Sequence, residues 1–258
     1  MQSLKGKKRI FGLRESFSYL ACAAVFTVCA ILVGFFSKEL TYDILTENAI
    51  NVNSGVGEKS ERVIILDPGH GGLDSGAVGL SGTLEKELNL DIAMKVRDIL
   101  VFNGYTVVMT RTDDSMYYDE NLSLSKKVQD TRHRVEMMGE YENCIFVSIH
   151  LNKFVSEKYS GLQVYYSPNV SESFDIAKGI QTYAKDLLQK DNDRKVKKSN
   201  ATIYVLDKAT VPAVLVECGF LSNVAEEKKL CDENYRKDIA SVLFLALDDY
   251  ISGEKYEK

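Results

Sequence analysis

The chain has few of the residue types that mark specialised folds or metal sites. Its 258 residues include no tryptophan, three prolines, three histidines and five cysteines. No two cysteines form a CxxC pair, so a cysteine-ligated zinc site is not expected, and we interpret the cysteines as small buried residues. The histidines are so few that the position of each one carries weight: His70, His133 and His150.

A basic surface for nucleic acid is also missing. The net charge is −5 at pH 7. Six basic residues and one acidic residue give the first 38 residues a charge of +5, which leaves −10 for the remainder. Because nucleic-acid binding requires a basic face, the acidic body excludes nucleic acid as an expected partner.

The segment from Phe17 to Phe36 has no charged residue and is long enough to span a bilayer as a helix. Basic residues precede it, so we expect a cytoplasmic N-terminus and an extracytoplasmic body. A cleaved signal peptide is the alternative, but no small-x-small cleavage site follows the run. We predict a cytoplasmic tail and membrane anchor over 1–38, a polar tether over 39–61 and a globular domain over 62–258.

The domain alternates strand and helix patterns. β-favouring apolar runs predict strands at 63–67, 106–110, 144–149, 161–167, 202–206 and 213–217. Apolar residues three or four apart predict helices within 85–103, 123–138, 171–187 and 235–250. This order predicts an α/β fold of three layers, with an open, twisted, mostly parallel sheet and helices on both faces, preceded by one N-terminal transmembrane helix.

Two further segments bear on a site. The helix that we expect to begin at Ser123 carries an apolar stripe, and His133 lies opposite that stripe, where we expect it to face solvent. The stripe consists of Leu124, Val128, Thr131, Val135 and Met138. The basic run from Arg194 to Lys198 is expected to be an exposed loop, with contact to an anionic substrate as the alternative.

Three predicted strands are each followed by, or end in, a residue that can bind metal or move a proton. The run VIILDPGHGG delivers His70, CIFVSI delivers His150, and AVLV delivers Glu217. If the strands are parallel, these residues meet at the carboxyl edge of the sheet, where open α/β folds place their sites. Two imidazoles and a carboxylate suggest a metal, and a catalytic zinc requires three protein ligands. Spacing leaves the third ligand open among Asp67, Asp74, Glu85 and Glu87.

Glu217 continues a wholly apolar strand, so we expect it to be at least half-buried. An ionised carboxylate in such a place needs a metal or a positive charge as partner. Beside a zinc ion, Glu217 can take a proton from bound water and return it to a leaving group.

Four motifs occur in the order DPGHGG, GTLEKELNL, VSIHLN and VLVECGFLSN. Together they resemble the zinc-dependent N-acetylmuramoyl-L-alanine amidases of the Amidase_3 type, over essentially the whole predicted domain. The resemblance implies an enzyme with one zinc ion held by His70, Glu85 and His150, and with Glu217 as the catalytic carboxylate. The implied substrate is peptidoglycan, cleaved at the amide between muramic acid and the first alanine of the peptide stem.

The layout of anchor, tether and one domain, without wall-binding repeats, is most similar to the germination-specific amidases of endospore formers. It implies a role in spore cortex modification, through muramic-lactam formation, and it leaves room for an activating protein partner. A vegetative amidase for cell separation, another zinc hydrolase and a non-catalytic peptidoglycan-binding protein stay open as alternatives. Asn89, Arg111 and Asn152 lie where the motifs continue, and we expect them to support the ligands or the fold.

Overall fold

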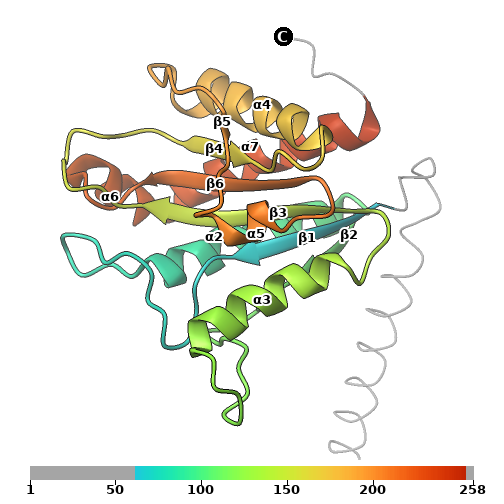
Figure 1. The fold of residues 1–258 in the computed structure, drawn as a ribbon. Helices are drawn as coiled ribbons and strands as arrows, with labels where there is room; N and C mark the ends of the chain where they lie inside the picture. Colours follow the sequence, from blue (N-terminus) through green and yellow to red (C-terminus); the bar gives the residue numbers. More distant parts are fainter. Residues whose placement is uncertain (1–61, 254–258) are drawn as a thin grey trace, which may run out of the picture. The chain divides into compact units, whose positions relative to one another are not determined.

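The computed structural model describes residues 62–253, which form a six-stranded sheet with helices on both faces (Figure 1). The strands are β1 (Val63–Pro68), β2 (Thr106–Met109), β3 (Cys144–Asn152), β4 (Gln163–Tyr166), β5 (Lys197–Lys198) and β6 (Ala213–Phe220). The helices are α2 (Glu85–Phe102), α3 (Lys126–Met138), α4 (Glu172–Tyr183), the π-helical turn η1 (Ala184–Leu188), α5 (Tyr204–Asp207), α6 (Val224–Leu230) and α7 (Glu233–Ser252).

The predicted tail, anchor and tether lie outside the described residues, so the boundaries at 38 and 61 stay predictions. Among the helices of residues 62–253, none has the length and apolar character needed to cross a membrane.

The strand order across the sheet is β2-β1-β3-β6-β4-β5. β1 pairs in parallel with β2 and β3, and β3 pairs in parallel with β6. β4 and β5 run in the opposite direction, since β4 is antiparallel to β6 and parallel to β5. The prediction of a mostly parallel sheet is therefore confirmed, and the carboxyl ends of β1, β3 and β6 lie side by side at one edge.

Alternating strand residues build a separate core on each face of the sheet. Ile64 and Leu66 of β1 pack in the core that includes residues of α2, α4 and α7. Ile65, between them, packs with Phe146 of β3 in the core that includes residues of α3 and α5. Both helix layers are visible in Figure 1, with α3 and α5 on the near face. Each such aliphatic or aromatic side chain contributes about 1.5–3 kcal/mol when fully buried.

Helix α3 departs from its prediction at its first turn. It begins after Ser125, whose hydroxyl accepts a hydrogen bond from the Val128 amide at 3.4 Å, rather than after Ser123. The expected stripe is wrong in this half, because Leu124 is 40% exposed and Val128 41% exposed. The buried face instead carries Gln129, Asp130, Arg134 and Met138. Polar side chains replace the apolar ones because they bind neighbouring loops. Arg134 donates to the loop after β1, whereas Gln129 and Asp130 accept hydrogen bonds from amides of the segment that precedes α3.

The region around the basic run also differs from its prediction. Thr202 to Leu206 is not a strand, because Asn200 accepts hydrogen bonds from the Thr202 amide and hydroxyl and starts the turn that leads into α5. Lys197–Lys198, expected in a loop, forms the short strand β5 beside β4, with both side chains exposed.

Two smaller expectations also need correction. Helix α6 was not predicted, although Asn223 marks its start by accepting hydrogen bonds from the amides of Ala225 and Glu226. Of the described cysteines, Cys144 and Cys218 are buried as expected, whereas Cys231 is exposed.

Candidate metal centre

The loop after β1 holds His70 in a backbone conformation that residues other than glycine rarely adopt. The φ of His70 is +62°, and no other non-glycine residue in the described part of the chain has a positive φ. Two arginines fix the loop through its carbonyls. Arg134 of α3 donates to the carbonyl of His70 at 2.8 Å, and Arg111 donates to that of Gly69 at 3.0 Å. The strained backbone is therefore held by bonds to its own carbonyl groups.

The site places glycine where a side chain would collide with it. A Cβ on Gly69 would lie 2.2 Å from the ring of His150. A Cβ on Gly76, whose φ is +67°, would lie 2.6 Å from both Glu85 Oε2 and His70 Cδ2. The two glycines therefore let the ligating side chains approach the loop backbone.

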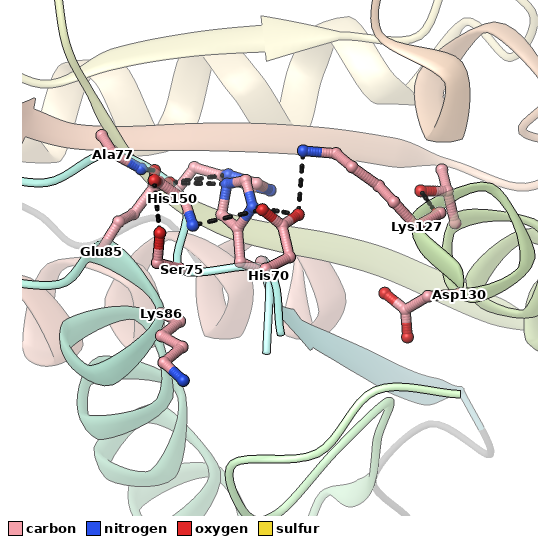
Figure 2. Close-up of polar contacts among 12 residues, drawn as sticks. His70, Ser75, Ala77, Glu85, Lys86, Lys127, Asp130 and His150 are labelled. Atoms are coloured by element: carbon pink, nitrogen blue, oxygen red, sulfur yellow. Dashed lines mark hydrogen bonds and ion pairs between the residues drawn. The ribbon is translucent and has the colours of Figure 1, made fainter. Parts of the chain in front are cut away.

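Glu85, the first residue of α2, joins the two histidines. Its Oε1 lies 3.2 Å from His70 Nε2 and 2.9 Å from His150 Nδ1 (Figure 2). One possible ligand atom from each of the three residues lies within 4.8 Å of the others, so the group can hold a metal ion. Burial opposes ionisation of Glu85, but the hydrogen bonds from His150 and His70 outweigh it and hold the pKa of Glu85 well below its usual range.

Neighbouring groups fix the orientation of the three side chains. Glu85 Oε2 accepts a hydrogen bond from the Ala77 amide at 2.7 Å, and Oε1 accepts one from Asn89 at 3.3 Å. Asp74 lies 2.8 Å from His70 Nδ1, which leaves His70 Nε2 facing Glu85. Lys127 reaches across from α3 to the same Asp74 oxygen at 2.9 Å (Figure 2). A carboxylate behind a histidine in this way sets which ring nitrogen can bind a metal.

Glu217 lies on β6 as the register partner of His150 on β3. Its Oε2 is buried and has no hydrogen-bond partner among the described residues. Burial, and secondarily the nearby Glu85 carboxylate, raise the pKa of Glu217 to about 7, against the opposing effect of the histidines. A carboxylate with that pKa is suited to accept and return a proton near neutral pH.

The structure brings His70, Glu85 and His150 together. It thereby selects Glu85 from the four carboxylates that the spacing left open as the candidate third ligand. Asp67 is bound by Arg134, Thr110 and Ser148, and Glu87 is exposed. His133 lies outside the group, half-exposed and stacked on Tyr117 at a centroid distance of 4.0 Å. The assignment of the three residues as zinc ligands and of Glu217 as the catalytic residue stays a prediction.

The supporting residues are partly those expected. Asn89 contacts Glu85 and the Gly69 carbonyl, and Arg111 fastens the loop, whereas Asn152 contributes its backbone carbonyl to the Leu221 amide. Arg134 was missed. Its signal in the sequence is the spacing of four residues from Asp130, with which it forms a buried ion pair.

A mixed α/β fold with two histidines and a carboxylate at the carboxyl edge of its sheet is suited to a metal-dependent hydrolase. Residues 64–249 match the family model Amidase_3, described as N-acetylmuramoyl-L-alanine amidase. The chain therefore belongs to the Amidase_3 family of N-acetylmuramoyl-L-alanine amidases, and the resemblance seen in its motifs is confirmed.

Individual relatives agree with this assignment. The germination-specific N-acetylmuramoyl-L-alanine amidase of Bacillus subtilis is 37% identical over 195 residues, which cover 75% of this chain and 81% of the relative. The CwlD amidase of Clostridioides difficile, solved in complex with the GerS lipoprotein, is 39% identical with a TM-score of 0.71, over 74% of this chain and 99% of CwlD. The catalytic domain of CwlV from Bacillus (Paenibacillus) polymyxa is 32% identical with a TM-score of 0.63, over 75% and 99% respectively.

Proposed function

We propose that the chain hydrolyses the amide between N-acetylmuramic acid and L-alanine in peptidoglycan, with one zinc ion held by His70, Glu85 and His150. The observation that carries the proposal is the convergence of these three side chains next to the unpartnered carboxylate oxygen of Glu217. The membership of the chain in the Amidase_3 family supports the same reaction.

The donor set suits zinc. Two imidazole nitrogens and one carboxylate oxygen are a ligand set of zinc hydrolases, which keep a fourth position for water or substrate. Atoms bound at about 2.1 Å to a tetrahedral ion lie roughly 3.4 Å apart. The separation of 3.2 Å between Glu85 Oε1 and His70 Nε2 is close to that value, and the separation of 2.9 Å between Glu85 Oε1 and His150 Nδ1 is shorter.

Each residue of the proposed site then has a defined task. When bound, zinc would polarise the scissile carbonyl and lower the pKa of water to about 7. Glu217 accepts a proton from the attacking water and delivers it to the departing alanine amine. Asp74 keeps the Nδ1 proton of His70, so that Nε2 stays available as a ligand.

We further propose that the enzyme works on the spore cortex, where stem removal leads to muramic lactam. The similarity to the germination-specific amidase of Bacillus subtilis supports this role. We place the catalytic domain outside the cytoplasm, tethered by the apolar run from Phe17 to Phe36. Since the similar CwlD amidase was solved with a lipoprotein, we infer that this chain also works with an extracytoplasmic protein partner.

Product analysis with the full-length chain in detergent tests the reaction. Zinc-loaded wild type should release intact peptide stems from peptidoglycan, identified by mass spectrometry. The Glu217→Gln variant should keep its zinc and lose activity by about 100-fold or more. Release of acetate or of a terminal amino acid would instead indicate a deacetylase or a carboxypeptidase, and binding without any product would indicate a non-catalytic wall protein.

A deletion strain tests the cellular role. Spores without the enzyme should lack muramic lactam in their cortex and fail to germinate, while vegetative cells separate normally. Chains of unseparated vegetative cells with a normal cortex would assign the enzyme to cell division instead.

A further inference from the structure

A cavity lies outside the candidate metal centre. It has a volume of about 680 Å³ and is lined by the segments 158–161, 188–194 and 223–229. This size is within the range of small-molecule sites. None of the three segments contains a residue of the candidate metal centre, so the cavity has no role in the chemistry described so far.

Cations without ion-pair partners line the cavity. Within residues 62–253, no salt bridge involves Lys158, Lys190, Arg194 or Lys229. Of the three acids in the lining, Asp191 is exposed and forms no salt bridge with a described residue, whereas Glu226 and Asp193 are engaged by other groups. Both carboxylate oxygens of Glu226 accept hydrogen bonds from backbone amides, one from Gly161 at 2.8 Å and the other from Phe220 at 2.9 Å. Asp193 pairs with Lys185 at 2.5 Å. The cavity is thus suited to an anion.

Arg194 connects this cavity to the strand that carries Glu217. Its guanidinium lies 4.7 Å from the ring centroid of Phe220, three residues after Glu217 on β6. It also donates to Gln163 Oε1 at a long 3.4 Å, and Gln163 is the register partner of Glu217 on β4. Among the described residues, the one short hydrogen bond of the Arg194 guanidinium is from Nε to the Ser160 carbonyl, at 2.7 Å. Its terminal nitrogens therefore have donors to offer a ligand.

We propose that this cavity binds the carboxylates of the acidic peptide on the amine side of the scissile bond, and that Arg194 recognises them. The proposal rests on the proposed function. Adjacent strands are about 4.8 Å apart, so Arg194 lies on the order of 10 Å from Glu217, a span that about three extended residues cover. A planar guanidinium binds a carboxylate through two parallel hydrogen bonds.

The anionic surface of a membrane is the competing ligand for a basic region. A membrane contact requires cations that protrude from a convex face. Here the basic side chains surround a hollow, and Arg194 is half-buried against Phe220. The geometry therefore favours a peptide that enters the cavity.

Peptide binding tests the proposal without turnover. The probe is the tripeptide Ala-γ-D-Glu-Lys, and its partner probe carries an amide in place of the glutamate α-carboxylate. Titration calorimetry on the full-length Glu217→Gln chain in detergent should give about tenfold weaker binding for the amidated probe. Adding Arg194→Gln should weaken binding of the acidic probe by about tenfold and leave the amidated probe unchanged, while Arg194→Lys should have an intermediate effect.

Lys198→Gln is the matched control, since it removes one charge from the same basic run outside the lining of the cavity. An equal loss of affinity in Lys198→Gln and Arg194→Gln would overturn the proposal, as would unchanged discrimination in Arg194→Gln. Reduced binding of Arg194→Gln to phosphatidylglycerol vesicles with unchanged peptide binding would assign Arg194 to a membrane contact. If the chain binds the acidic probe more tightly than the amidated probe but cleaves no amide, the proposed function is refuted and the proposal that the cavity binds carboxylates stands.

Discussion

His150 on β3 and Glu217 on β6 are paired residues of two parallel strands, so their side chains leave the sheet on the same face. The candidate ligand and the candidate base are thus positioned by the backbone hydrogen bonds of the sheet. Neither depends on a mobile loop for its place, which is the arrangement that gives a catalytic site its precision.

Shortening the base should therefore slow the reaction without releasing the metal. Glu217→Asp keeps a carboxylate on β6 and withdraws it by about 1.5 Å, the length of one carbon-carbon bond. A misplacement on that scale can lower the rate by about 100-fold. The measurement is the rate of stem release at saturating zinc, alongside zinc content by atomic absorption. Full activity would show that Glu217 is not the proton carrier.

Removing either candidate histidine ligand should abolish stoichiometric zinc. His70→Ala and His150→Ala each leave two ligands, too few for a stable site. His133→Ala is the matched control, because this third histidine stacks on Tyr117 outside the group. Zinc content of the purified full-length variants decides the question. If either variant still binds one full equivalent of zinc, the histidine that it lacks is not a ligand of the ion.

A single methyl group on Gly69 should disturb the centre. Its Cβ would lie 2.2 Å from the ring of His150, so the imidazole must move. We expect Gly69→Ala to lower zinc affinity by about tenfold or more, measured by competition with a chelator. Gly179→Ala, in α4, is the control, since its Cβ would come no closer than 3.9 Å to Ala246. Equal affinities in the two variants would contradict this account of the loop.

The buried pair of Asp67 and Arg134 should make stability depend on pH. Burial opposes ionisation of Asp67, but Arg134 and the hydroxyls of Ser148 and Thr110 hold its pKa below the usual value of about 3.9. Because the folded-state pKa is depressed, the stabilisation is complete above the unfolded-state pKa. It is lost as the pH falls through the folded-state value.

Asp67→Asn should reduce the loss of stability that accompanies falling pH. It should also lower the free energy of unfolding near pH 7 by about 3–5 kcal/mol, since Arg134 stays buried without its charge partner. Thr110→Val, which removes one neutral donor to Asp67, should lower the free energy of unfolding by about 1 kcal/mol and leave its dependence on acidic pH in place. Denaturant titrations between pH 3 and 7 give both quantities. An unchanged slope in Asp67→Asn would assign the acid sensitivity to other carboxylates.

The sequence was sufficient for the strands that carry the site. Apolar β-runs ending in His70, His150 and Glu217 made the carboxyl edge predictable, because parallel strands place their ends together. The choice of Glu85 over Asp67, Asp74 and Glu87 came only from the family resemblance. In the structure that choice depends on where the loop returns to α2, which no local pattern encodes.

The errors share a physical cause. The apolar stripe of α3 failed at Leu124 and Val128 because Arg134 faces inward to bind the loop after β1, and Asp130 faces inward to pair with Arg134. A charged side chain is expected outside, and only its tertiary partner explains why it is buried. The segment from Thr202 to Leu206 likewise has β-favouring residues, yet Asn200 redirects the backbone into a turn.

The reversed direction of β4 has a consequence for how the family can vary. Since β4 runs against β6, the connection that leads into it, residues 153–162, lies at the carboxyl edge with Glu217. Phe154 and Val155 in this connection are 55% and 101% exposed. Insertions or deletions there would reshape the entrance for a glycan or peptide while β3 and β6 keep their pairing, so substrate range can diverge independently of the hydrolytic chemistry.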